Sequence, residues 1–233
     1  MHLRHALLMG LVIVHFGCKD EEQEMLAKAD QGLPTAGAFV DALLDAQANA
    51  ADAPACDGPV PMPTLLFTQE RLDSLRAGTG EVSMHPAWDP VEGHPCHRKA
   101  RVSDLQIVAH YRERKLRSGV KAIQVLNAVE DATECHAALK SFVVFRTDEV
   151  EAAKLTSEHS FDPGWAKGQL RVFEPNGSLR CATKVQIESD PEVSVYGGNE
   201  KEDKEQALKI DLELKLSHAA FEALGDAKLE RHI

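Results

Sequence analysis

Apolar residues recur at helical spacing in the first quarter of the chain. Phe39, Leu43 and Ala46 follow one another at intervals that place them on one side of a helix, and Asp52-Ala53-Pro54 then stops the pattern. Residues 37–51 are therefore predicted to form an amphipathic helix.

A shorter helix is predicted after Thr68. The hydroxyl of Thr68 can accept a hydrogen bond from the first helical turn, Leu72 and Leu75 share one face, and Gly78 can adopt the left-handed conformation that ends a helix.

The strongest strand signal is a hairpin in the second half of the chain. Residues 169–173 and 179–187 flank Glu174-Pro-Asn-Gly-Ser178, and Asn-Gly is the pair that tight hairpin turns favour. These stretches are predicted to be antiparallel strands with one buried and one solvated face. A further β-rich run, Phe142 to Phe145, follows a helix that Asn127 and Glu130 would cap.

Two segments fit the spacing of a helix and also the alternation of a strand. Leu105, Ile107, Ala109 and Tyr111 alternate with more polar residues and predict a strand, although Ser103-Asp104 could equally cap a helix there. In residues 204–223 the leucines alternate and also recur every four positions. Because Ala, Leu, Glu and Lys dominate that segment, it is predicted to be a helix that ends at Gly225.

Together these elements predict an α+β fold, with a small antiparallel sheet of three or four strands, helices packed on one face, and disulfide stabilisation. The chain is 43% hydrophobic, which suffices for one core. We expect a signal peptide at 1–17, a flexible tether at 18–35, which is charged and then punctuated by Gly and Pro, and a single α+β domain at 36–233.

The first residues have the pattern of an export signal. Arg4 precedes the apolar stretch from Ala6 to Phe16, which is shorter than the roughly 20 apolar residues that cross a bilayer, and Gly17-Cys18 follows. This leader resembles the bacterial lipoprotein signal, in which a small residue precedes a cysteine that becomes the lipid-bearing N-terminus, although His15 and Phe16 depart from its usual form.

The resemblance implies lipidation of Cys18 and a domain anchored to a membrane of the cell envelope, facing the periplasm or the exterior. The alternatives are ordinary secretion with cleavage nearby, and an uncleaved anchor or a misplaced start. The resemblance covers only the first eighteen residues of the chain.

Four cysteines remain beyond Cys18, namely Cys56, Cys96, Cys135 and Cys181. An even number in a chain bound for an oxidising compartment predicts disulfides. Of the three possible pairings, Cys56–Cys96 with Cys135–Cys181 is favoured, because each bond closes a short loop without crossing the other. The rival interpretation is a zinc site built on Cys96-His97 and Cys135-His136, but none of the usual zinc-ligand spacings is present.

The net charge of −11 disfavours nucleic acid as a partner, because phosphate binding relies on clustered Lys and Arg. The expected partners are the membrane, through the N-terminal lipid, and an envelope protein.

Residues 80–99 hold the best candidate for chemistry. His85, His94 and His97 lie close together in sequence with Asp89 and Glu92 between them, a set that could bind a transition metal, but the spacing matches no known mechanism and an exposed proline-rich loop is the stronger interpretation.

The sequence contains no Gly-x-Ser-x-Gly motif, so no catalytic residue and no cofactor is assigned. The favoured role is a non-catalytic envelope protein that binds or scaffolds another component. The alternative is a metal-binding protein or metal-dependent enzyme that uses the loop at 80–99.

Overall fold

The computed structural model describes residues 3–49, 52–57, 64–78, 96, 99, 101–157, 160–193 and 201–224. The helices within them are α1 (Leu3–Ala48), α2 (Gln69–Ala77), α3 (Val102–Arg112), α4 (Ala122–Ala138) and α5 (Lys201–Leu224). The strands are β1 (Thr64–Thr68), β2 (Ser141–Glu151), β3 (Lys154–Leu155), β4 (Phe161–Asp162), β5 (Trp165–Phe173) and β6 (Leu179–Glu188).

The main sheet has the strand order β1-β2-β5-β6, and β3 and β4 form a small second sheet. The predicted α+β, disulfide-stabilised fold is confirmed. The sheet is mixed, however, because β1 runs parallel to β2 while β2, β5 and β6 are antiparallel neighbours. The chain passes from β1 to β2 through α2, α3 and α4, and a crossover of this kind produces a parallel pair.

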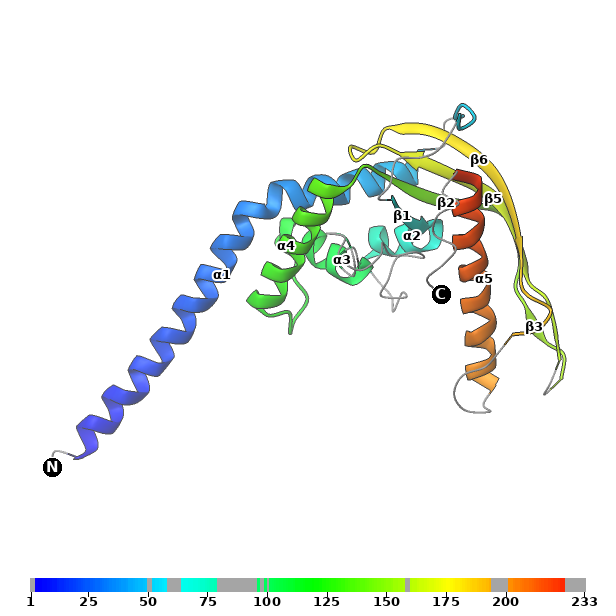
Figure 1. Ribbon diagram of the computed structural model, residues 1–233. Coiled ribbons are helices and arrows are strands. Elements are labelled where there is room, and N and C mark those ends of the chain that lie inside the picture. Colours follow the sequence, from blue (N-terminus) through cyan, green and yellow to red (C-terminus); the bar gives the residue numbers. More distant parts are fainter. Residues whose placement is uncertain are drawn as a thin grey trace.

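Both faces of the sheet are buried around the middle of β1 and the start of β2. Phe142 and Val144 belong to the core that α1 to α4 complete, whereas Val143 and Phe145 belong to a second core completed by α5. Helices therefore cover both faces instead of one, because β2 carries apolar residues at successive positions. Figure 1 shows α5 running beside the curved β5–β6 hairpin.

Helix α1 differs from the predicted flexible tether at 18–35, because this stretch is helical and Pro34 lies inside the helix. Ala29 and Phe39 are fully buried. Packing therefore begins before residue 36, where the domain was predicted to start, since small and apolar residues recur at helical spacing on both sides of the proline. The N-terminal part of α1 extends away from the rest of the protein (Figure 1).

The capped helix after Thr68 is confirmed as α2. The Arg71 N–H donates to Thr68 Oγ1 at 3.4 Å, and Leu72 and Leu75 are buried. Gly78 ends the helix with a φ of 62°.

The predicted hairpin is confirmed as β5 and β6. The Glu174 N–H donates to the Ser178 carbonyl oxygen, and the Gly177 N–H donates to the Glu174 carbonyl oxygen, both at 2.9 Å. Gly177 has a φ of 85°, which a residue without Cβ adopts without strain. A Cβ there would also lie 2.9 Å from the Ala42 carbonyl oxygen, so the turn packs against α1.

The strand predicted at 105–111 is wrong, and the alternative helix is correct as α3, although Arg101 occupies the N-cap position instead of Ser103 or Asp104. Its buried residues are Val102, Leu105, Val108 and Tyr111, which recur every three positions and fall on one side of α3.

Helix α4 begins at Ala122, earlier than the predicted cap at Asn127, and the Gln124 side chain accepts a hydrogen bond from the Lys121 N–H at 2.9 Å. The β-rich run from Phe142 lies in β2, and the predicted C-terminal helix is confirmed as α5.

The favoured disulfide pairing is wrong. Cys56 bonds to Cys181 and Cys96 bonds to Cys135. The first bond follows from backbone pairing beside it, because the Ala182 N–H on β6 donates to the Pro54 carbonyl oxygen at 2.9 Å. The observed bonds are nested, an arrangement that also avoids crossing.

Candidate functional site

The candidate functional site is a groove of about 750 Å³ between α5 and the sheet, which we call the α5 groove. Its apolar lining consists of Phe145, Val150, Ala152, Ala153, Leu155, Ala166, Ile187, Leu208, Leu212 and Leu216. Its polar lining consists of Thr68, Glu70, Thr147, Lys154, Glu205, Lys209 and Glu213. The volume lies within the range typical of small-molecule sites, roughly 300–1,000 Å³.

A β-bulge in β2 determines which side chains reach this groove. The register between β2 and β5 shifts between Thr147 and Glu149, so that Val150 pairs with Ala166 and lines the groove. Strict alternation from Phe145 would have turned Glu149 inward. The bulge instead places Glu149 on the opposite face, where it lies 3.6 Å from the Lys167 ammonium.

Three leucines of α5 form the opposing wall. Leu208, Leu212 and Leu216 step by four residues and line the groove. Leu216 is 2% exposed, whereas Val150 across the groove is 62% exposed. The apolar lining is thus deeply buried beside Phe145 and open to solvent at the end of β2.

An ion pair marks the deep end. Arg71, 3% exposed, lies with its Nη2 at 3.0 Å from Glu213 Oε2 and links α2 to α5. Burial lowers the pKa of the Arg71 guanidinium, while the charge and hydrogen bond of Glu213 oppose that shift. Glu70 lines the groove at the same end, at the N-terminus of α2.

The open end carries lysines. Lys154 on β3 and Lys209 on α5 both line the groove, together with Glu205. The Lys154 ammonium lies 3.7 Å from Glu151, and both side chains are largely exposed. Lys209 has no ion pair within the part of the chain that the structure describes.

Most of the residues that line the groove are apolar. The described residues of the groove wall include no His, Cys or Ser. The backbone N–H and C=O groups of β5 are engaged in ladders with β2 and β6, those of β2 are engaged with β5 and, as far as Phe145, with β1, and those of α5 are engaged within the helix. The groove therefore presents a largely apolar surface, along which Glu205, Lys209 and Glu213 recur every four residues of α5.

A second hollow, of about 500 Å³, lies where α1 meets the end of α3. Its charged groups pair with one another: Arg112 contacts Asp41 at 2.7 Å and Arg114 contacts Asp30 at 3.5 Å. These pairs leave little for a ligand to bind, so the α5 groove remains the candidate.

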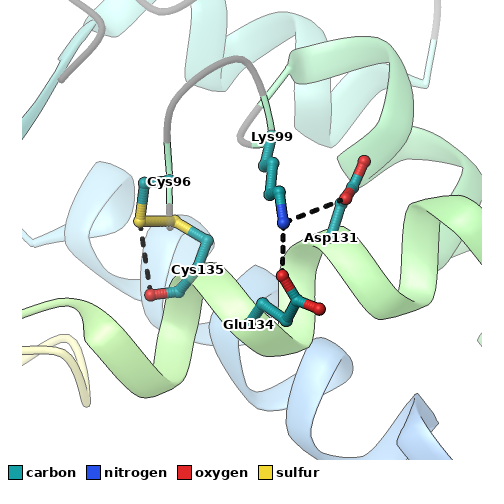
Figure 2. The surroundings of a disulfide bond; sticks show 5 residues. All are labelled: Cys96, Lys99, Asp131, Glu134 and Cys135. Carbon is teal, nitrogen blue, oxygen red and sulfur yellow. Dashed lines mark hydrogen bonds and ion pairs between the residues drawn. A yellow bond between two sulfur atoms is a disulfide. The ribbon is translucent and has the colours of Figure 1, made fainter. Parts of the chain in front are cut away.

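Cys96 and Cys135 are not metal ligands, because they form a disulfide with each other. Figure 2 shows Cys96 bonded to Cys135 at the C-terminal end of α4, and both are fully buried. A disulfide sulfur carries no thiolate, which zinc requires. The ring of His136 stacks on Phe39 with centroids 5.4 Å apart, and its Nε2 lies 3.2 Å from the Pro175 carbonyl oxygen. The zinc interpretation of the two Cys-His pairs is thus wrong for these cysteines.

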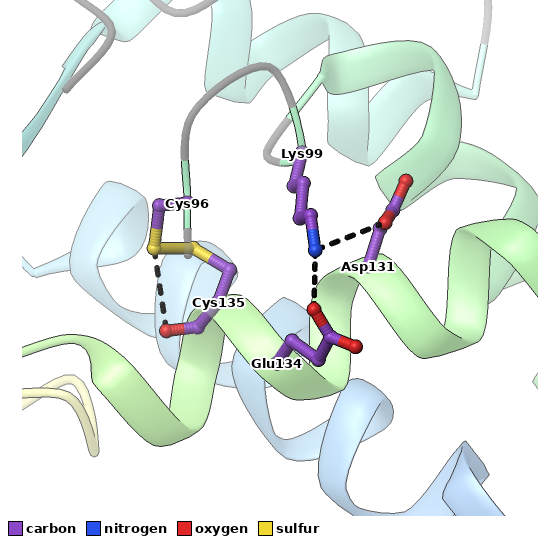
Figure 3. Close-up of polar contacts among 5 residues, drawn as sticks. All are labelled: Cys96, Lys99, Asp131, Glu134 and Cys135. Carbon is purple, nitrogen blue, oxygen red and sulfur yellow. Dashed lines mark hydrogen bonds and ion pairs between the residues drawn. A yellow bond between two sulfur atoms is a disulfide. The ribbon is translucent and has the colours of Figure 1, made fainter. Parts of the chain in front are cut away.

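Charged side chains next to this disulfide hold Lys99 against α4 (Figure 3). The Lys99 ammonium contacts Glu134 and lies 3.8 Å from Asp131. The hydrogen bond to Glu134 raises the pKa of Lys99, and burial raises the pKa of Asp131. We interpret this cluster as structural support for the bond.

The remaining predicted site residues are placed as follows. His85, His94 and His97 lie outside the described residues, and the residues described include no group of three or more His, Cys, Asp or Glu side chains that could hold a metal ion. Cys18 lies within α1. No helix in the described part of the chain is long and apolar enough to span a membrane.

No protein-family model, no curated protein and no solved structure matches this chain. The functional assignment therefore depends on the sequence and on the geometry of the α5 groove.

Proposed function

We propose that this chain is an exported, lipid-anchored, non-catalytic protein of the cell envelope that binds an apolar ligand in the α5 groove. The observation that carries the proposal is the largely apolar lining, in which Phe145 and Val150 on β2 flank Thr147 and are opposed by the leucines of α5. A hydrocarbon chain buried there gains about 0.8 kcal/mol per methylene, the usual value for transfer out of water.

The position of Cys18 in α1 supports the anchoring part of the proposal. Cleavage before Cys18 would leave a lipid at the start of a helix whose residues 20–24 are exposed and whose Ala29 is buried. The interval from Cys18 to Ala29 spans about 17 Å of helix, so the lipid would be followed by an acidic helical stalk. The two disulfides agree with an oxidising compartment outside the cytoplasm.

The groove is tested with N-phenyl-1-naphthylamine, an uncharged dye that fluoresces in apolar sites. We expect the protein to bind the dye, and Val150→Glu to weaken binding at least tenfold, because a carboxylate would then have to be desolvated beside the ligand. Since Val150 is 62% exposed, the variant should keep its fold, which circular dichroism would verify.

The matched control is Glu149→Gln, one residue away on the other face of the sheet, which should bind the dye as the wild type does. Absence of dye binding by the wild type, or equal binding by Val150→Glu, would refute the groove as a ligand site.

The anchor is tested separately by intact mass spectrometry of membrane-extracted protein. A chain beginning at Cys18 with added acyl mass is the expected result. An unmodified chain with another N-terminus would contradict lipid anchoring and leave the groove proposal untouched.

A further inference from the structure

The two ends of the α5 groove differ in charge, and we infer from this that its ligand is an alkyl chain ending in an anionic head group, a carboxylate or a phosphate. The head group lies between Lys154 and Lys209, and the alkyl chain extends toward Phe145 and Leu216. This inference rests on the proposed function and adds the class of ligand and its orientation.

A hydrocarbon chain fits the middle of the groove better than a peptide does. A peptide brings N–H and C=O groups that need partners when they are buried. The backbone groups of β5 are engaged with β2 and β6, those of β2 are engaged with β5 and, as far as Phe145, with β1, and most side chains that line the groove are apolar. An alkyl chain requires no hydrogen bonds and loses nothing there.

The length of the groove also suits an extended chain. Its α5 wall runs from Glu205 to Leu216, which corresponds to about 17 Å at the rise of an α-helix. Leu208 and Leu216 on this wall are 5% and 2% exposed and Leu212 between them is half-buried, whereas Val150 at the end of β2 is 62% exposed. The apolar wall therefore extends along three turns of α5, and the polar end of a ligand belongs at the solvent-exposed end of β2.

The charged residues at the two ends of the groove indicate the charge of the ligand's head group. At the deep end Glu70 and Glu213 both line the groove, and the buried Arg71 is already paired with Glu213, so an anion is disfavoured there. At the open end Lys154 and Lys209 outnumber Glu205. The only ion pair of Lys154 in the described chain is the exposed one with Glu151, and such pairs contribute little. Both ammonium groups are therefore available to an anion.

The test displaces the dye with four ligands of equal chain length: dodecanoate, dodecyl phosphate, dodecanol and dodecyltrimethylammonium, all below their micellar concentrations. We expect the two anions to bind about five- to tenfold more tightly than dodecanol, the gain from two partly exposed ion pairs, and the cation to bind more weakly than dodecanol. The preference should shrink as salt is raised. Comparing the affinities of dodecanoate and dodecyl phosphate shows whether a carboxylate or a phosphate head group is preferred.

The variant Lys154→Met/Lys209→Met should bind dodecanoate no more tightly than dodecanol. The matched control is Lys167→Met/Lys184→Met, which removes two lysines from the opposite face of the same sheet and should keep the preference for anions. Equal binding of anion, alcohol and cation by the wild type would overturn this inference while the groove remained an apolar site. Failure of every alkyl ligand to displace the dye would overturn the proposed function as well.

Discussion

Val150 lies opposite Ala166 in the ladder between β2 and β5, and both side chains line the α5 groove. This pairing depends on the bulge at Asp148, which moves Glu149 to the other face of the sheet. The groove is therefore apolar at this point because of a backbone irregularity next to a run of acidic residues.

Gly168 should be required for this bulge. It pairs with Thr147, and a Cβ on it would lie 2.1 Å from the Arg146 carbonyl oxygen and 2.8 Å from the Phe145 ring. We expect Gly168→Ala to lower the free energy of unfolding by about 1–3 kcal/mol, the usual cost of overpacking, and to weaken dye binding.

Urea denaturation measures the effect, with Gly37→Ala as the control. Gly37 lies in α1, where the nearest atoms to an added Cβ belong to the Arg112 side chain at 3.4 Å. This variant should gain up to about 1 kcal/mol, because Ala favours helix over Gly. Equal effects at both glycines would contradict the close approach at Gly168.

Breaking the pair between Arg71 and Glu213 should destabilise the protein. Glu213→Gln leaves the buried guanidinium without its counter-charge, and we expect a loss of about 3 kcal/mol, at the low end of the usual cost because Glu213 is 29% exposed. Arg71→Met/Glu213→Leu should recover most of that loss. A double-mutant cycle by urea denaturation measures the coupling, and additive effects would show that the pair does not connect α2 to α5.

The nested disulfide pairing can be tested by peptide mapping. Proteolysis without reduction should release one linked fragment pair holding Cys56 with Cys181 and another holding Cys96 with Cys135. Replacing the longer-range pair by Ala should cost about 5 kcal/mol and the shorter-range pair about 4 kcal/mol, from the loop closed by each bond. Fragments joining Cys56 to Cys96 would contradict the topology around β6.

Stability should depend on pH through Asp131. Because burial raises the pKa of this carboxyl above its ordinary value of 3.8, its contribution to stability is present below 3.8 and is lost as the pH rises through the folded-state pKa. Asp131→Asn should therefore become more stable relative to the wild type as the pH rises from 3.8 through the folded-state pKa of Asp131.

Lys99 lowers the pKa of Asp131, so Lys99→Met should raise it further. Carboxyl NMR titration measures both proteins, with Lys115→Met as a control whose ammonium pairs with Glu113. An unchanged pKa in Lys99→Met would show that the ammonium does not act on this carboxyl.

Elements with local signals could be predicted from the sequence. The Asn-Gly turn specifies the β5–β6 hairpin, and Thr68 with Gly78 delimits α2, because turn and cap chemistry depends on neighbouring residues. The alternation of apolar and polar residues predicted the wrong element at α3. Leu105 and Tyr111 are buried there, but the buried residues recur every three positions, as in a helix. A short apolar run does not distinguish the two periods.

Features that depend on tertiary proximity could not be predicted. The bond between Cys56 and Cys181 requires the chain near Pro54 to lie beside β6, which no local pattern indicates. The spacing of Leu208, Leu212 and Leu216 identified one apolar face of α5, but the strand residues that it faces depend on the bulge. The valine within Asp148-Glu-Val-Glu151 is the one sequence feature that could have pointed to the groove.

The most direct test of the central claim is a methyl NMR titration of the protein with dodecanol. We expect concentration-dependent shifts for the methyl groups of Val150, Leu155, Ile187, Leu208 and Leu212, and none for Val125 and Val129 in the core that α1 to α4 form. Unchanged groove methyls at saturating dodecanol, or shifts confined to the helical core, would contradict the assignment of the α5 groove as a ligand site.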